Sequence, residues 1–146
     1  MTPEQKLKAL VLAAIQDDEY RRDLLSDQVP GILDPIPVFG PEMDALYSAA
    51  QEADEDLVWE FQDELRVSGE DTDLVCDWSR YYESKGRAVQ ALDGSWVGFT
   101  YWYGGGKHGE PGSVEWMDDA YDVEVHEETR VIRIFSKKNH VKDSHD

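Results

Sequence analysis

Cysteine is nearly absent from this sequence: Cys76 stands alone, so no disulfide can form within the chain and a cysteine-rich zinc site is excluded. No apolar run approaches the roughly 20 residues that a membrane-spanning helix needs. The first residues also lack the basic-then-apolar pattern of a signal peptide. These absences predict a cytoplasmic protein with no membrane partner, in which Cys76 is a small buried apolar residue.

Positive charge is scarce as well. The chain has 14 Lys and Arg residues against 32 Asp and Glu residues, which gives a formal net charge of −18. Because such an excess repels the phosphate backbone, we expect no direct binding to nucleic acid. With 146 residues and a hydrophobic content of 40%, the chain is long enough to bury one core. We predict a single domain over residues 1–138 and a polar tail over residues 139–146.

No catalytic motif is present. The side chains considered for acid–base or metal chemistry are His108, Glu110, Asp118 and Asp119. On a helix, the adjacent Asp118 and Asp119 would point about 100° apart and would not converge on one atom. The remaining histidines, which lack the spacing of metal ligands, are His126, His140 and His145. The sequence therefore favours a non-enzymatic protein that uses no cofactor and no metal.

Residues 95–121 hold seven of the sixteen aromatic residues, so we expect this stretch to form the centre of the fold. Apolar side chains alternate onto both faces of residues 95–103, which predicts a central strand covered on each side. The pair Asp93-Gly94 predicts a two-residue hairpin turn that joins it to a strand over residues 87–92. The residues expected to be mainly buried are Trp96, Phe99, Tyr101, Trp102, Met117, Val131 and Ile134.

A glycine-rich loop follows this strand at residues 104–109. Apolar residues then recur at helical spacing behind Ser113, which predicts a helix over residues 113–121 with Ser113 as its N-cap. Two β-rich runs, residues 122–126 and 130–135, are separated by a short polar turn and predict a second hairpin.

The N-terminal part of the chain is predicted to be helical. Thr2 occupies an N-cap position, with Pro3 at the first helical residue and Gln5 at the capping-box position. The helix weakens after residue 15, and a short turn over residues 19–25 continues it. Four prolines within residues 26–41 then exclude a regular helix and predict an ordered connector.

Two further helices are predicted after this connector. Apolar residues at three- and four-residue steps indicate a long helix over residues 41–65 and another over residues 73–84. The predicted fold class is α+β. Its N-terminal helices pack against a C-terminal antiparallel sheet, in the order αααββαββ.

The acidic residues are concentrated in one region. Between Glu42 and Asp77 lie thirteen acidic residues and a single basic residue, Arg66. On the predicted long helix, carboxylates four residues apart are separated by roughly 6 Å, about the spacing of phosphates along a nucleic-acid strand. Such a face either occupies a basic groove built for nucleic acid or is simply well solvated. The carboxylates predicted to contact a partner are Glu52, Asp56, Glu60, Asp63 and Glu64.

In composition and size, the chain is similar to the small acidic inhibitors that phages and mobile elements use against restriction or CRISPR nucleases, some of which imitate nucleic acid. The similarity concerns charge and length, and it assigns no role to individual residues. It implies an inhibitor that docks a negatively charged helical face on a basic, nucleic-acid-binding surface of a partner protein.

The glycine loop suggests an alternative function, a small ligand- or anion-binding domain. Backbone N–H groups of a glycine run ahead of a helix can hold an anion, and two basic side chains would add positive charge. His108 stands where a P-loop has Ser or Thr, so the loop is not a P-loop. A wide connection whose residues need positive φ would also explain the glycines, without any bound anion. The residues of this alternative site are Gly104, Gly105, Gly106, Lys107 and His108.

Overall fold

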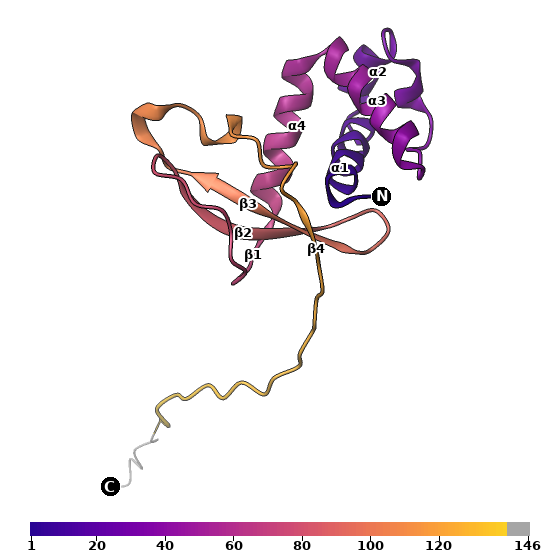
Figure 1. Cartoon of the computed structure of the whole chain (residues 1–146). Helices are drawn as coiled ribbons and strands as arrows, with labels where there is room; N and C mark the ends of the chain where they lie inside the picture. Colours follow the sequence, from indigo (N-terminus) through magenta and orange to yellow (C-terminus); the bar gives the residue numbers. More distant parts are fainter. Residues whose placement is uncertain (140–146) are drawn as a thin grey trace, which may run out of the picture.

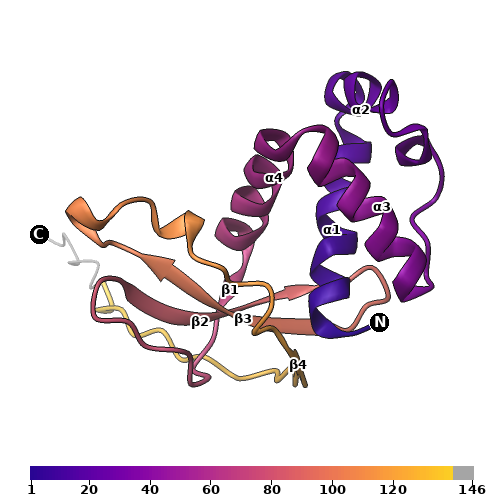
Figure 2. The ribbon, with the colours of Figure 1, turned by 45° about the horizontal axis from the view of Figure 1, so that its top comes forward.

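Four α-helices precede a four-stranded antiparallel sheet in the computed structural model, which describes residues 1–139 (Figure 1). The predicted α+β class is confirmed, whereas the order of elements differs from the predicted one. The helices gather at one end of the sheet, with α1 lying between α3 and the strands (Figure 2). Their bounds are α1 (Pro3–Asp17), α2 (Glu19–Ser26), α3 (Gly40–Ala53) and α4 (Glu55–Ser68).

The strands follow one another in the sheet in the order β1-β2-β3-β4, so β3 is the central strand that its two apolar faces predicted. β2 and β3 pair over their whole length, whereas β4 pairs only with the first three residues of β3. The strands are β1 (Glu70–Asp71), β2 (Glu83–Gln90), β3 (Trp96–Tyr103) and β4 (Tyr121–Val123). Three short 3₁₀ helices connect these elements: η1 (Pro30–Leu33), η2 (Gly106–His108) and η3 (Pro111–Ser113).

The first helix forms as its sequence predicts. The Thr2 hydroxyl accepts a 3.2 Å hydrogen bond from the Gln5 backbone N–H, and the Gln5 side chain accepts a 2.9 Å bond from the Thr2 N–H. This capping box satisfies two donors that the first turn would otherwise leave unpaired. The fully buried residues of α1 are Leu7, Ala9, Val11, Leu12 and Ile15. Their apolar surface makes α1 the centre of the helical layer.

The sheet contributes Val97 and Phe99 of β3 to the same core, and both are fully buried. The Phe99 ring lies 4.7 Å from the Trp116 ring, measured between centroids. Of the predicted core, Phe99, Trp102 and Met117 are buried, and Trp96 and Tyr101 are half-buried. The prediction is wrong for Val131 and Ile134, which are 93% and 88% exposed.

The hairpin between β2 and β3 is confirmed, but its turn is longer than predicted. Only Gly94 has a positive φ, of 88°, and Asp93 does not. The Gly94 N–H donates to the Ala91 carbonyl oxygen at 3.0 Å, and the Ala91 N–H donates to the Ser95 carbonyl oxygen at 2.7 Å. The connection is therefore a turn closed by a glycine bulge, and Gly94 supplies the left-handed residue.

Two predicted helical stretches are each divided by an aspartate. The prediction of one long helix over residues 41–65 is wrong, because Asp54 ends α3 and caps α4. The Asp54 carboxylate accepts a 3.1 Å hydrogen bond from the Leu57 N–H. Asp18 does the same between α1 and α2, where it accepts a 3.2 Å bond from the Arg21 N–H. Aspartate is a strong N-cap because its oxygen replaces a missing helical acceptor.

The predicted helix over residues 73–84 is also wrong. Only its last two residues belong to β2, and residues 73–82 form an irregular loop. Hydroxyl groups bind the backbone here instead of a helix: the Ser84 hydroxyl donates to the Asp77 carbonyl oxygen at 2.7 Å, and the Asp77 N–H donates to the Thr100 hydroxyl at 3.2 Å. Such bonds compete with helix formation. Cys76, predicted to be buried, is half-buried in this loop.

No helix forms over residues 113–121, although one was predicted. The Glu115 carboxylate accepts hydrogen bonds from the N–H groups of Met117 and Asp118, at 3.0 and 3.2 Å. These bonds hold an irregular turn that buries Trp116 and Met117 together, which a helix would point about 100° apart.

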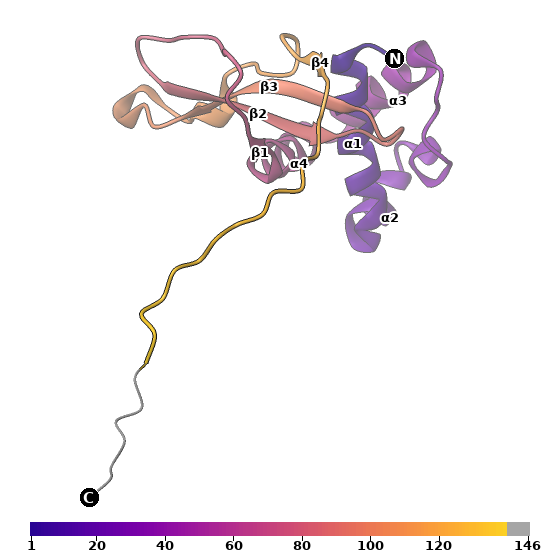
Figure 3. The same cartoon turned by 90° about the horizontal axis from the view of Figure 1, so that it is seen from below.

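The second hairpin does not form. β4 covers part of the predicted strand over residues 122–126, but residues 130–135 are not a strand and the chain from residue 124 to 139 runs away from the body (Figure 1, Figure 3). The intervening residues 127–129 contain no Gly or Asn to close a tight turn. In the predicted polar tail, residues 140–146, with His140 and His145, lie outside the described residues.

Candidate partner-binding surface

The break at Asp54 changes the acidic face that the sequence predicted. Glu52 belongs to α3, and the other four carboxylates belong to α4, so the five do not share one helical face. The prediction of a single face is therefore wrong, because the helical spacing was carried across a boundary between two helices.

Two of these five carboxylates are held in ion pairs. Glu60 accepts from the Arg21 guanidinium of α2 at 2.8 Å, and this hydrogen bond raises the pKa of Arg21 above its ordinary value. Asp63 accepts from Arg66 at 2.7 Å, where the Arg66 side chain is only 9% exposed. The first pair joins α2 to α4, and the second holds the buried Arg66 side chain within α4, so these two carboxylates have a structural role as well as a charge.

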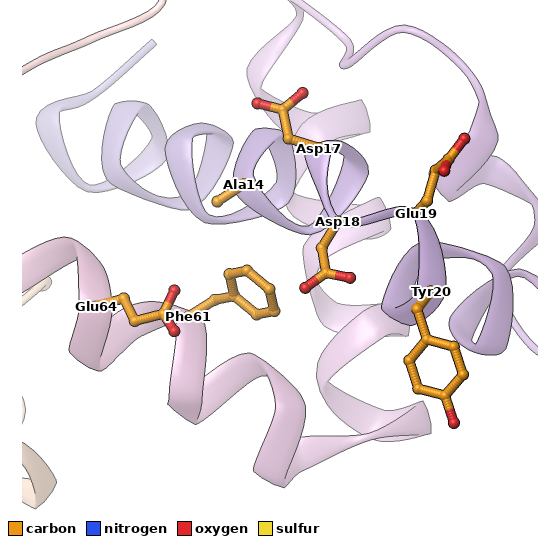
Figure 4. A pocket seen from close by; sticks show the side chains of 7 residues that line it. All are labelled: Ala14, Asp17, Asp18, Glu19, Tyr20, Phe61 and Glu64. Carbon is orange, nitrogen blue, oxygen red and sulfur yellow. The ribbon is translucent and has the colours of Figure 1, made fainter.

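The exposed carboxylate of Glu64 lies on a depression that the sequence did not predict. This depression has a volume of about 710 Å³ and lies between the end of α1, the start of α2 and α4 (Figure 4). Phe61 and Glu64 project into it from α4 and face Asp18, while Tyr20 lies at its far side (Figure 4). Its acidic lining residues are Asp17, Asp18, Glu19 and Glu64.

A second depression, of about 290 Å³, shares Tyr20 with the first and continues it along α4. Arg21, Leu24 and Leu57 line it together with three carboxylates: Asp54, Asp56 and Glu60. Tyr20 and Leu24 are exposed in it, at 74% and 56%. We call the lining of the two depressions the α2–α4 acidic surface. Its seven carboxylates are accompanied by one guanidinium, that of Arg21.

Sequence reasoning missed the part of this surface that α1 and α2 contribute. The signal was present as the run Asp17-Asp18-Glu19, at the point where the first helix weakens. Asp18 and Asp54 share one pattern: each caps a new helix, and acidic residues follow in the first turn of that helix. The two acidic helix starts are brought together because α2 and α4 both pack against α1, and the ion pair of Arg21 and Glu60 joins them.

The glycine loop is held by its neighbours through ordinary structural contacts. Gly104, Gly105, Gly106 and Gly109 all have positive φ, as the glycine content predicted. The Tyr82 hydroxyl donates a 2.9 Å hydrogen bond to the His108 carbonyl oxygen. The helix that would have offered its N-terminus to an anion is not formed. Lys107 and His108 are exposed beside a single 3₁₀ turn.

The side chains considered for catalysis are not brought together. His108, Glu110, Asp118 and Asp119 are all exposed, and within residues 1–139 no hydrogen bond joins any two of these side chains. In the same part of the chain, no group of three or more His, Cys, Asp or Glu side chains is arranged to hold a metal ion. No helix there is long and apolar enough to cross a membrane.

Comparisons with protein-family models, with curated proteins and with solved structures return no match. The functional proposal therefore depends on the geometry of the α2–α4 acidic surface.

Proposed function

We propose that this chain is a non-enzymatic acidic binding protein whose α2–α4 acidic surface docks on a basic surface of a partner protein. The observation that supports it best is the composition of the two adjoining depressions: seven carboxylates, one guanidinium, and the exposed side chains of Tyr20 and Leu24 between them. A basic, nucleic-acid-binding surface has the complementary charge, and an inhibitor of a nuclease would have this function in a phage or mobile element.

The charge distribution favours recognition over solubility alone. Surface helices usually intersperse both signs of charge, whereas the single guanidinium of this surface is already paired with Glu60. The remaining carboxylates would attract Lys and Arg side chains and increase the rate of encounter with a basic partner.

The shape of the surface favours side chains that protrude from the partner. Asp56 and Glu64 lie eight residues apart on α4, which corresponds to roughly 12 Å along its axis. Between the carboxylates, Tyr20 offers an aromatic ring of the kind that commonly contributes most to binding energy in interfaces. A partner would therefore insert basic side chains into the depressions and cover Tyr20.

The experiment starts from a partner captured from a cytoplasmic lysate at low salt and identified by mass spectrometry. The variant Asp17→Asn, Asp56→Asn and Glu64→Gln neutralises three exposed carboxylates of the surface. The control Glu42→Gln, Glu110→Gln and Asp119→Asn removes the same charge elsewhere on exposed positions. We expect the first variant to slow association and reduce its salt dependence, since complementary charge acts first on the encounter rate. Tyr20→Ala should mainly accelerate dissociation.

Equal association rates and equal salt slopes for the variant, its control and the parent chain would contradict the proposal. The acidic surface would then be a solvated surface without a partner.

A further inference from the structure

The described end of the chain projects from the body without covering any of it. Residues 124–139 have no secondary structure and are all exposed (Figure 1, Figure 3). Four large apolar side chains in this segment are between 79% and 93% exposed: Val131, Ile132, Ile134 and Phe135. Side chains of this kind are normally buried, and a group of them exposed so close together in the sequence indicates an interaction segment.

The same segment has a charge opposite to that of the remaining chain. Residues 129–139 contain four basic residues and no acidic residue. Without these four positive charges, the net charge of −18 becomes −22 for the rest of the chain. The β-branched and aromatic residues of this run suit an extended strand. We call residues 129–139 the basic strand segment.

A groove of about 460 Å³ lies where the chain leaves the sheet. Ala88 of β2 and Trp96 of β3 line it together with the apolar side chains of Leu74, Val123 and Val125. The acidic residues along it are Glu70, Asp71, Asp73 and Glu124. An apolar lining between carboxylates matches a strand whose apolar side chains are flanked by Arg and Lys.

We propose that the basic strand segment of one copy binds in this groove of a second copy, and that the exchange is reciprocal and forms a homodimer. Within the described residues, β1 and β4 are the two edge strands of the sheet, and β1, whose residues line the groove, pairs only with β2. An extended segment beside it would gain backbone hydrogen bonds in addition to apolar and charge contacts. Because each copy has one groove and one segment, a two-fold dimer satisfies both at once.

The segment does not return to its own groove. Residues 123–126 form one wall of that groove, so residues 127–129 would have to reverse the chain at once. These three residues are Glu, Glu and Thr, which are poorly suited to the positive φ of a tight hairpin turn. The direction of the chain, away from its own sheet, requires no reversal to reach a second copy (Figure 3).

Sedimentation velocity of the full chain, over a range of protein and salt concentrations, tests the proposal. The parent chain should dimerise, and its dimer should weaken with added salt. The tail variant Arg130→Glu and Arg133→Glu should raise the dimer dissociation constant at least about tenfold, because like charges then face each other. The groove variant Asp73→Lys and Glu124→Lys should do the same. The control Asp27→Lys and Asp119→Lys changes the charge equally, at exposed sites outside the groove, and should remain dimeric.

The decisive sample is an equimolar mixture of the tail variant and the groove variant. In their heterodimer, each segment meets a groove of opposite charge, so the mixture should dimerise although neither variant does so alone. A monomeric parent chain, which is the result expected if the segment folds back on its own copy, would overturn the proposal. A tail variant that dimerises as well as the parent, or a mixture that stays monomeric, would overturn it too.

Discussion

The guanidinium of Arg66 in α4 donates a 2.9 Å hydrogen bond to the carbonyl oxygen of Trp102 in β3. It also donates to the Asp63 carboxylate at 2.7 Å, and its side chain is 9% exposed. Gly112 lies so close that a methyl group on it would approach the Asp63 carboxylate at 2.7 Å. One buried cation thus joins the last turn of α4, the central strand and the segment that follows the glycine loop.

Replacement of Arg66 by Ala should lower the free energy of unfolding by about 3–5 kcal/mol, because it leaves the Trp102 carbonyl and the Asp63 carboxylate without their partner. Urea denaturation measures the change. Arg80→Ala is the control, since Arg80 is exposed and should change the midpoint little. Arg66→Lys should be intermediate, because an ammonium keeps the charge but cannot donate in two fixed directions. Equal midpoints for the parent chain and Arg66→Ala would contradict this account.

Trp102 and Trp78 allow a matched test of the core. Trp102 is 7% exposed, whereas Trp78 is 82% exposed in the loop before β2. Trp102→Ala should lower the free energy of unfolding by about 3–5 kcal/mol, as loss of a buried aromatic side chain usually does. Trp78→Ala should have little effect. Thermal and urea denaturation of both variants measure the difference. Similar losses of stability for the two variants would contradict the placement of Trp102 in the core and Trp78 on the surface.

The predictions that hold depend on strong local signals. Thr2-Pro3 with Gln5 defines a capping box, and Gly94 marks the hairpin turn, because each conformation is decided by a few neighbouring residues. The central position of β3 also follows from residues close in sequence, since aromatic side chains on both its faces require neighbours on both sides.

The predictions that fail concern segments where distant contacts decide. Helical spacing over residues 73–84 is overridden by hydroxyl groups that bind the backbone, among them Thr100 of another strand. The acidic surface needed α2 and α4 to be placed side by side, and nothing in the run Asp17-Asp18-Glu19 indicates that α4 lies next to it. The helical spacing of apolar residues also continues across Asp54 by coincidence, so the sequence predicted one helix where there are two.

The pH dependence of stability should reveal the buried phenol of Tyr47. Burial raises its pKa to about 12, against an ordinary value of about 10 in the unfolded chain. The fold therefore favours the protonated phenol. Its contribution to stability is fully present below pH 10 and is lost as the pH rises from about 10 to about 12.

Over this range the parent chain should lose stability more steeply than Tyr47→Phe, by up to about 1.4 kcal/mol per pH unit. Urea midpoints of both proteins at pH 9, 10 and 11 give the comparison. The variant also lacks the hydrogen bond from the Gln62 side chain, which shifts its stability at every pH without changing the slope. Parallel pH profiles would mean that Tyr47 titrates alike in the folded and unfolded chains.

The glycine loop should not respond to anions. Without a helix behind Pro111–Ser113, only exposed Lys107 and His108 are left to attract a phosphate, and such side chains are well solvated. A thermal-shift panel of phosphate and nucleotides should therefore move the melting temperatures of the parent chain and of Lys107→Ala equally. A rise in the parent that is lost in Lys107→Ala would instead identify the loop as an anion-binding site, since binding to the folded state stabilises it.

Two pairs of carboxylates from the predicted acidic face should have opposite effects on stability. Glu60 and Asp63 accept hydrogen bonds from Arg21 and Arg66, at 2.8 and 2.7 Å. Glu52 and Glu64 are exposed and, within residues 1–139, make no ion pair. Neutralisation of either pair removes two negative charges from an overcharged chain, so the general relief of repulsion is the same for both.

The difference between the two double variants therefore measures the ion pairs. Glu60→Gln with Asp63→Asn should lower the urea midpoint, because the replacement amides cannot balance the guanidinium charges and Arg66 is buried. Glu52→Gln with Glu64→Gln should leave the midpoint equal or slightly higher, because these carboxylates only repel their neighbours. High salt should reduce the second effect more than the first, since exposed charges are screened more strongly than buried ones. Identical midpoints for the two variants would show that the ion pairs of Arg21 and Arg66 do not stabilise the fold. All four carboxylates would then be equivalent surface charges.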